Sequence, residues 1–231
     1  MHFLLTNDDG IEAPGLAALA EAIHSIPGAR VSIVAPVTEQ SMCGHAVTTR
    51  KPLVVEPRGH GKWAVHGPSA DSVRIGLYAL DLKPDWVLSG VNAGGNLGQD
   101  IVISGTVAAV REAAYHGIPA MAFSHYLKRG LEVDWARISS WVVEVTARLS
   151  GERLHDGEYW NVNFPHHPPG PMAMPEMSRC LPERLPLGVA YESNEDGHYL
   201  YTASYSERPR IPGSDVAECF DGKISVSRLK V

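Results

Sequence analysis

Short apolar segments alternate with amphipathic segments along the first 165 residues, and this alternation restricts the fold more than any other feature. The apolar segments have the length of strands and cover residues 2–6, 30–36, 85–89, 120–124 and 160–164. Helical spacing of apolar residues lies between them, at Leu16 to Ile23, Val73 to Leu80, Thr106 to His116 and Asp134 to Leu149. The pattern predicts an α/β, Rossmann-like fold with a mainly parallel sheet and helices on both faces.

The residue composition changes after Pro165, where prolines become frequent and a Tyr-rich stretch follows. Helical periodicity disappears, and Asn194–Gly197 has the composition of a hairpin tip. We therefore expect a single domain over residues 1–231. Residues 1–165 would form the α/β core, and residues 166–231 would form loops and an extended, projecting β-hairpin that serves oligomerisation.

Charge and composition exclude several classes of function. The formal net charge of −6 argues against binding to nucleic acid polymers, which rests on clustered Lys and Arg. No apolar stretch approaches the length of a membrane span, and no signal peptide is visible, so we expect no membrane partner. The three cysteines form no Cys-x-x-Cys pair, which favours a reducing cytoplasm.

Four polar loops, over residues 7–10, 39–45, 89–100 and 104–106, follow the predicted strands at the sheet edge where ligands bind in parallel sheets. The first loop holds the adjacent carboxylates Asp8 and Asp9, and Gly10 permits the turn that would let both reach one ion. Such oxygen donors suit Mg²⁺ or Mn²⁺. A plain turn with solvated acids is the competing interpretation.

Two further loops at this edge are suited to an anion. Residues 89–100 contain four glycines and two asparagines, which favours close approach of backbone amides to a ligand, although a mobile surface loop has the same composition. Ser104, Gly105 and Thr106 precede a predicted helix, whose amino end favours phosphate. Ordinary N-capping explains the same hydroxyls. Together the loops favour metal-assisted phosphoryl transfer.

The ordered motifs resemble the SurE survival-protein family, densely over residues 1–165. They are Leu4–Ile11 with Ala13–Leu16, Val34–Pro36 with Ser41, Gly67–Asp71, Ser89–Asn92 through Asp100, Ser104–Val107 and Asn161–Asn163. The chain departs from the usual pattern at Ser69, at Met42-Cys43 and at Ile103, which replaces a frequent aromatic residue.

The resemblance implies a metal-dependent phosphomonoesterase that hydrolyses nucleoside 5′- and 3′-monophosphates, and in some relatives short polyphosphate. It implies one Mg²⁺ or Mn²⁺ per subunit and a homodimer or homotetramer. The implied metal ligands are Asp8, Asp9, Ser41 and Asn92, with Asp8 and Asp9 also catalytic. The implied phosphate contacts are Asn96, Ser104, Gly105 and Thr106.

Several questions of mechanism stay open at this point. Asp8 could act as a general base or as a nucleophile. His45 and His66 could protonate the leaving oxygen, although incidental positions are the simpler interpretation, and Arg111-Glu112 is interpreted as a structural pair.

Two other classes of function are alternatives. A non-catalytic nucleotide-binding regulator would use the same pocket. An NAD-type oxidoreductase is disfavoured because the first strand lacks a following Gly-x-Gly-x-x-Gly.

Overall fold

The computed structural model describes residues 1–231 and contains a nine-stranded sheet in the order β3-β4-β2-β1-β5-β6-β7-β11-β8. Its strands are β1 (His2–Thr6), β2 (Arg30–Pro36), β3 (Val55–Pro57), β4 (Lys62–Val65), β5 (Trp86–Ala93), β6 (Ala120–His125), β7 (Glu158–Phe164), β8 (Met177–Arg179) and β11 (Ile224–Lys230). The six central strands, β4-β2-β1-β5-β6-β7 in sheet order, run parallel to one another. Strand β3 pairs antiparallel with β4, and β11 pairs antiparallel with β7. The expected Rossmann-like, mainly parallel sheet is confirmed.

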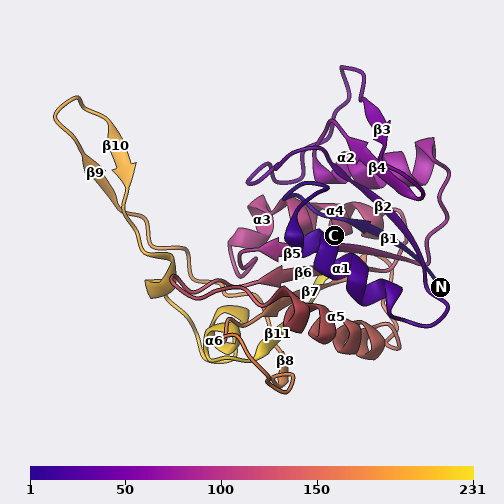
Figure 1. Cartoon of the computed structure of the whole chain (residues 1–231). Coiled ribbons are helices and arrows are strands. Elements are labelled where there is room, and N and C mark those ends of the chain that lie inside the picture. Colours follow the sequence, from indigo (N-terminus) through magenta and orange to yellow (C-terminus); the bar gives the residue numbers. More distant parts are fainter.

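Helices cover both faces of this sheet (Figure 1). On one face, α1 (Pro14–His24) and α5 (Trp135–Leu149) enclose a core cluster of 24 buried residues. On the other face, α2 (Ser69–Arg74) and α4 (Gly105–Tyr115) enclose a cluster of 15. The wider helical turn η1 (Ile75–Ala79) continues α2. No helix combines the length and apolar character required to cross a membrane.

Local sequence explains how the helices on the first face begin. The Asp134 side chain caps α5 by accepting from the Arg137 amide at 3.0 Å, and an apolar stripe from Ile138 to Leu149 is buried. Helix α1 begins at Pro14, and a Cβ on the next residue, Gly15, would lie 1.9 Å from the Val91 carbonyl oxygen. Glycine is therefore required for α1 to approach the end of β5.

The strand order reverses between β1 and β5, and this reversal sets the position of the site. The chain passes from β1 to β2 on one side, and later returns to β5 on the other side of β1. The loops leaving the carboxyl ends of these two strands therefore diverge and leave a crevice at this switch point.

The C-terminal third contains more regular structure than the sequence predicted. The expected hairpin is present as β9 (Tyr191–Ser193) and β10 (Tyr199–Tyr201), and it projects far from the body (Figure 1). However, residues 166–231 also include the helix α6 (Asp215–Phe220), the short helical turn η2 (Tyr205–Glu207), and strands β8 and β11 of the main sheet. The description of this region as loops and a hairpin is corrected accordingly. Helix α6 has six residues, too few to show a helical period.

Candidate functional site

A cavity of about 270 Å³ lies at the switch point and collects residues from the polar loops. Its lining includes Asp8, Asp9, Glu39, Ser41, Met42, Asn92, Asn96, Asp100, Ile103, Ser104 and Tyr205. A larger cavity of about 520 Å³ lies beside Trp160, Arg179 and Arg228 and contains none of the predicted site residues. We therefore take the smaller cavity as the candidate site, because the chemically suited groups converge there.

Asp8 lies two residues after the end of β1 and is almost fully buried, with 4% of its surface exposed. Burial raises the pKa of Asp8 to about 6, the neighbouring charge of Asp9 adds to this, and a hydrogen bond from the Thr106 hydroxyl opposes it. At Gly105, a Cβ would lie 2.8 Å from both Cβ and Oδ2 of Asp8. Helix α4 can therefore approach Asp8 only with glycine at this position.

Asp9 is held by the end of β5. Its Oδ2 accepts a hydrogen bond from the Ala93 amide at 3.2 Å, which joins the loop after β1 to the end of β5. Burial raises the pKa of Asp9, and the charge of Glu39 adds to the shift. The turn at Gly10, with φ of +106°, lets both adjacent carboxylates line the same cavity.

Ser41 and Asn92 lie in the same cavity lining as the two aspartates. The Ser41 hydroxyl donates to Glu39 Oε1 at 2.6 Å, which leaves its oxygen lone pairs available. The Asn92 amide nitrogen donates to the Gly94 carbonyl at 2.8 Å, and this fixes the orientation of its other end, the acceptor oxygen. All four side chains therefore carry oxygen atoms and line one cavity.

Asn96 is fixed by side chains of the two neighbouring strands. Its amide nitrogen donates to the Ser124 hydroxyl at 2.7 Å, and its backbone N–H donates to Asn163 Oδ1 at 2.8 Å. Its carbonyl accepts from Asn161 at 2.9 Å and from Asn163 at 3.1 Å. The motif Asn161–Asn163, for which the sequence suggested no role, thus anchors a predicted phosphate contact.

The segment Ser104–Thr106 combines capping with placement at the site. Ser104 caps α4 by accepting from the Val107 amide at 3.1 Å, and it lines the cavity as well. Its hydroxyl proton stays available for a ligand. Thr106 is fully buried and points to Asp8, so its hydroxyl supports the carboxylate instead of lining the cavity.

The donor set fits a hard divalent cation. The cavity lining includes four carboxylates and no Lys or Arg, so a phosphate dianion could enter only with added positive charge. Its acidic side chains do not form, with His or Cys, a group of three or more suited to one ion. A cation here would therefore need neutral oxygen ligands beside the adjacent pair Asp8 and Asp9, and Ser41 and Asn92 are neutral oxygen-bearing side chains within the lining.

The structure does not bring the two considered histidines to this cavity. His45 pairs with Glu112 at 2.7 Å and His66 with Glu56 at 2.6 Å. Arg111 and Glu112 do not pair with each other: Arg111 donates to the Ile101 carbonyl at 3.0 Å, whereas Glu112 binds other partners. All of these residues have structural contacts.

Three cavity residues with polar side chains were not assigned a role from the sequence. Glu39 and Asp100 lie inside loops that were recognised only as wholes, and Tyr205 belonged to a Tyr-rich stretch assigned to the hairpin. Tyr205 is the one aromatic residue in the lining. Its placement depends on tertiary contacts of η2, for which the local sequence carries no signal.

Comparison with known proteins identifies the family of the chain and agrees with the fold. A family model described as survival protein SurE matches residues 3–185. A 5′-nucleotidase SurE from Geotalea uraniireducens is 44% identical over 235 residues, which cover 99% of this chain and 92% of the relative. A 5′-nucleotidase SurE from Paramagnetospirillum magneticum is 36% identical, covering 99% and 89%. The crystal structure of SurE protein from Aquifex aeolicus matches with a TM-score of 0.85 and 32% identity, covering 100% of this chain and 93% of that one.

Proposed function

The chain belongs to the SurE survival-protein family, and on this basis we propose that it is a 5′-nucleotidase, a metal-dependent phosphomonoesterase that hydrolyses nucleoside monophosphates. One observation carries the proposal: loops from β1, β2, β5 and the start of α4 bring carboxylates, neutral oxygens and a helix amino end to one cavity. This combination suits phosphoryl transfer, where catalysis rests on positioning and charge stabilisation.

Asp8, Asp9, Ser41 and Asn92 would hold one Mg²⁺ or Mn²⁺ per subunit. When bound, the cation supplies positive charge and Lewis acidity to the phosphoryl group. As a general base, Asp8 takes a proton from the water that attacks phosphorus while the P–O bond to the nucleoside breaks, and the nucleoside oxygen takes up that proton. As a nucleophile, Asp8 displaces the nucleoside oxygen, which takes a proton from water, and a second water then hydrolyses the aspartyl phosphate to free phosphate. The Thr106 hydrogen bond fixes the carboxylate for either role.

The phosphate itself would be held on the other side of the cavity. Asn96 and the Ser104 hydroxyl bind its oxygens, and the amino end of α4 at Gly105 and Thr106 adds favourable partial charge. The proposal extends to 3′-monophosphates and short polyphosphate, and to action in the cytoplasm as a homodimer or homotetramer.

Release of inorganic phosphate from a panel of nucleoside 5′- and 3′-monophosphates tests the proposal. The assay is run with Mn²⁺, with Mg²⁺ and with EDTA. We expect release with a divalent cation and none with EDTA. Nucleotide binding without release under any metal would overturn the enzymatic function and favour a regulator that uses the same pocket.

A further inference from the structure

Asp100 presents an electrostatic problem for a phosphate site. Its carboxylate lines the cavity together with Asp8, Asp9 and Glu39, but it lies outside the proposed cation ligands. An unpaired carboxylate at this position would repel a phosphate dianion, and the repulsion would be strong because solvent and salt screen charges poorly in a partly buried site. Something must therefore neutralise Asp100.

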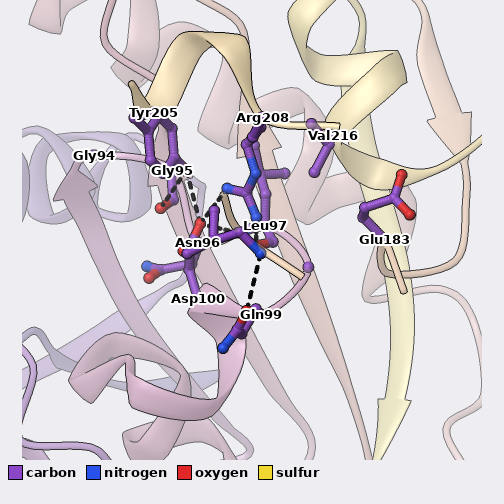
Figure 2. Close-up of polar contacts among 12 residues, drawn as sticks. Gly94, Gly95, Asn96, Leu97, Gln99, Asp100, Glu183, Tyr205, Arg208 and Val216 are labelled. Carbon is purple, nitrogen blue, oxygen red and sulfur yellow. Dashed lines mark hydrogen bonds and ion pairs between the residues drawn. The ribbon is translucent and has the colours of Figure 1, made fainter. Parts of the chain in front are cut away.

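Arg208 supplies the opposite charge from the segment that follows the hairpin. Its Nη1 lies 2.7 Å from Asp100 Oδ2, and its side chain is 1% exposed. Its Nη2 donates to the Leu97 carbonyl at 3.1 Å, and the guanidinium lies 4.8 Å from the ring centre of Tyr205. The Tyr205 hydroxyl donates to the same Asp100 oxygen at 2.7 Å (Figure 2). Arg208 is thus buried against Asp100 and is not among the residues that line the cavity.

The contacts of Arg208 and Tyr205 with Asp100 hold the segment between Asn96 and Ser104, the two predicted phosphate contacts. Asp100 lies between Asn96 and Ser104 in the chain, in the short helix α3 (Asp100–Ile103). Its carbonyl accepts from the Ser104 amide at 3.0 Å, and its carboxylate accepts from the Leu97 amide at 3.4 Å. A residue that binds Asp100 therefore holds this stretch in place.

We propose that Arg208 is a positioning residue of the phosphate site, which neutralises Asp100 and thereby lets the cavity admit a phosphate dianion. The inference rests on the proposed function, because it concerns affinity for the phosphate of the substrate. Arg208 itself does not line the cavity, so it acts through Asp100.

The test compares KM and kcat for the best nucleotide of the panel in a set of purified variants. Arg208→Gln should raise KM by roughly tenfold to a hundredfold with a smaller change in kcat, because it leaves an unpaired carboxylate beside the phosphate. Arg208→Lys keeps the charge and should remain within about threefold of wild type. Arg210→Gln is the matched control, because this substitution removes the same charge at an exposed position. The Arg210 side chain lies over Phe220 and does not contact Asp100.

Asp100→Asn separates charge from structure and covers the case in which Arg208→Gln does not fold. The amide oxygen still accepts hydrogen bonds, while the repelling charge is gone, so KM should fall below the wild-type value. The same change should restore KM in the Arg208→Gln background. A KM that rises in Asp100→Asn, or a double variant no better than Arg208→Gln, would overturn the inference.

A second readout separates this inference from the proposed function. Binding of inorganic phosphate in Mn²⁺ is measured by calorimetry in the same variants, and the affinities should follow the same order. If the wild-type protein released no phosphate from any nucleotide, the proposed function would fail. The order of phosphate affinities among the variants would still test the role of Arg208. If the wild-type protein were active but Arg208→Gln bound phosphate with the same affinity, the inference about Arg208 would be wrong and the proposed function would stand.

Discussion

The Thr106 hydroxyl is the one side-chain hydrogen bond donor that binds the Asp8 carboxylate. Asp8 has no cationic side chain beside it, and its buried position disfavours the charged form. A hydrogen bond to an ionised, buried carboxylate stabilises that form by about 1.5–3 kcal/mol. Thr106 therefore controls how readily Asp8 is ionised for catalysis.

Thr106→Val should remove this hydrogen bond with little change in volume. We expect the pKa of Asp8 in the metal-free protein to rise above about 6, because the lost bond is the largest of the contributions that lower it. Phosphate release should fall about tenfold to a hundredfold. Carboxyl NMR titration and steady-state kinetics measure the two effects.

The matched control is Thr146→Val, since Thr146 is equally buried but its hydroxyl has no hydrogen bond partner. This variant should keep wild-type turnover. If Thr106→Val and Thr146→Val had equal activity, the hydroxyl of Thr106 would have no role in the site.

Residues that are adjacent in the chain could be predicted from the sequence, and residues that meet only in the fold could not. Asp8 and Asp9 occupy one loop directly after a strand, where ligand sites of parallel sheets occur. Arg208 and Asp100 are 108 residues apart, so their pairing has no local signature. The same holds for the hydrogen bonds between Asn96 and Asn163, which are 67 residues apart.

At the scale of elements, Glu112 of α4 joins three parts of the fold. It is buried, and its carboxylate lies 2.6 Å from Arg74 of α2, 2.7 Å from His45 of the loop after β2, and 2.9 Å from His116. Burial opposes its ionisation, yet hydrogen bonds from these three partners hold the pKa of Glu112 at about 2. The network therefore favours the ionised form and links α2 to α4.

Glu112→Gln should lower the free energy of unfolding at pH 7 by about 2–4 kcal/mol, because it leaves buried donors without their charged partner. A carboxyl pKa that is lowered on folding stabilises the protein above its ordinary value of 4.5, and this stabilisation is lost as pH falls toward 2. The difference between wild type and Glu112→Gln should therefore shrink between pH 5 and pH 2. Urea unfolding at several pH values measures it.

Glu144→Gln is the control for this prediction, because Glu144 forms an exposed pair with Arg148 at 3.5 Å. Exposed pairs contribute about 0–1 kcal/mol, so its effect should be small. A difference that stayed constant with pH would show that the Glu112 charge does not stabilise the fold.

Long elements were predicted well and short ones were not. The helix expected from about Asp134 to Leu149 is α5, and the strand expected over residues 30–36 is β2. Strands β3, β4 and β8 have three or four residues each, which is too short for a period-2 pattern to stand out. Their positions depend on pairing with partners that are distant in the chain.

At the scale of the whole molecule, the projecting hairpin contributes exposed apolar surface. Tyr191, Tyr199, Leu200 and Tyr201 are each at least half exposed and lie far from the two core clusters (Figure 1). Exposed apolar residues gathered on one arm are typical of a surface that binds another protein chain. This supports the proposed assembly of copies through the hairpin.

Replacing Tyr191–Tyr201 with Asn-Gly should reduce the size of the assembly and leave turnover within about threefold of wild type. The Thr202 amide donates to the Ala190 carbonyl at 2.9 Å, so a two-residue turn can close the shortened hairpin. Light scattering after size-exclusion chromatography measures the mass. An unchanged mass would contradict the role of the hairpin in assembly.

The most direct test of the central claim is phosphate release by Asp8→Asn beside Asp81→Asn, in Mn²⁺ and with the best nucleotide of the panel. Asp81 is an exposed carboxylate paired with Lys83 outside the cavity, so it controls for loss of one acidic charge. We predict that Asp8→Asn loses turnover by roughly 10²- to 10⁴-fold while Asp81→Asn matches wild type. Wild-type turnover in folded Asp8→Asn would contradict the assignment of the reaction to the switch-point cavity.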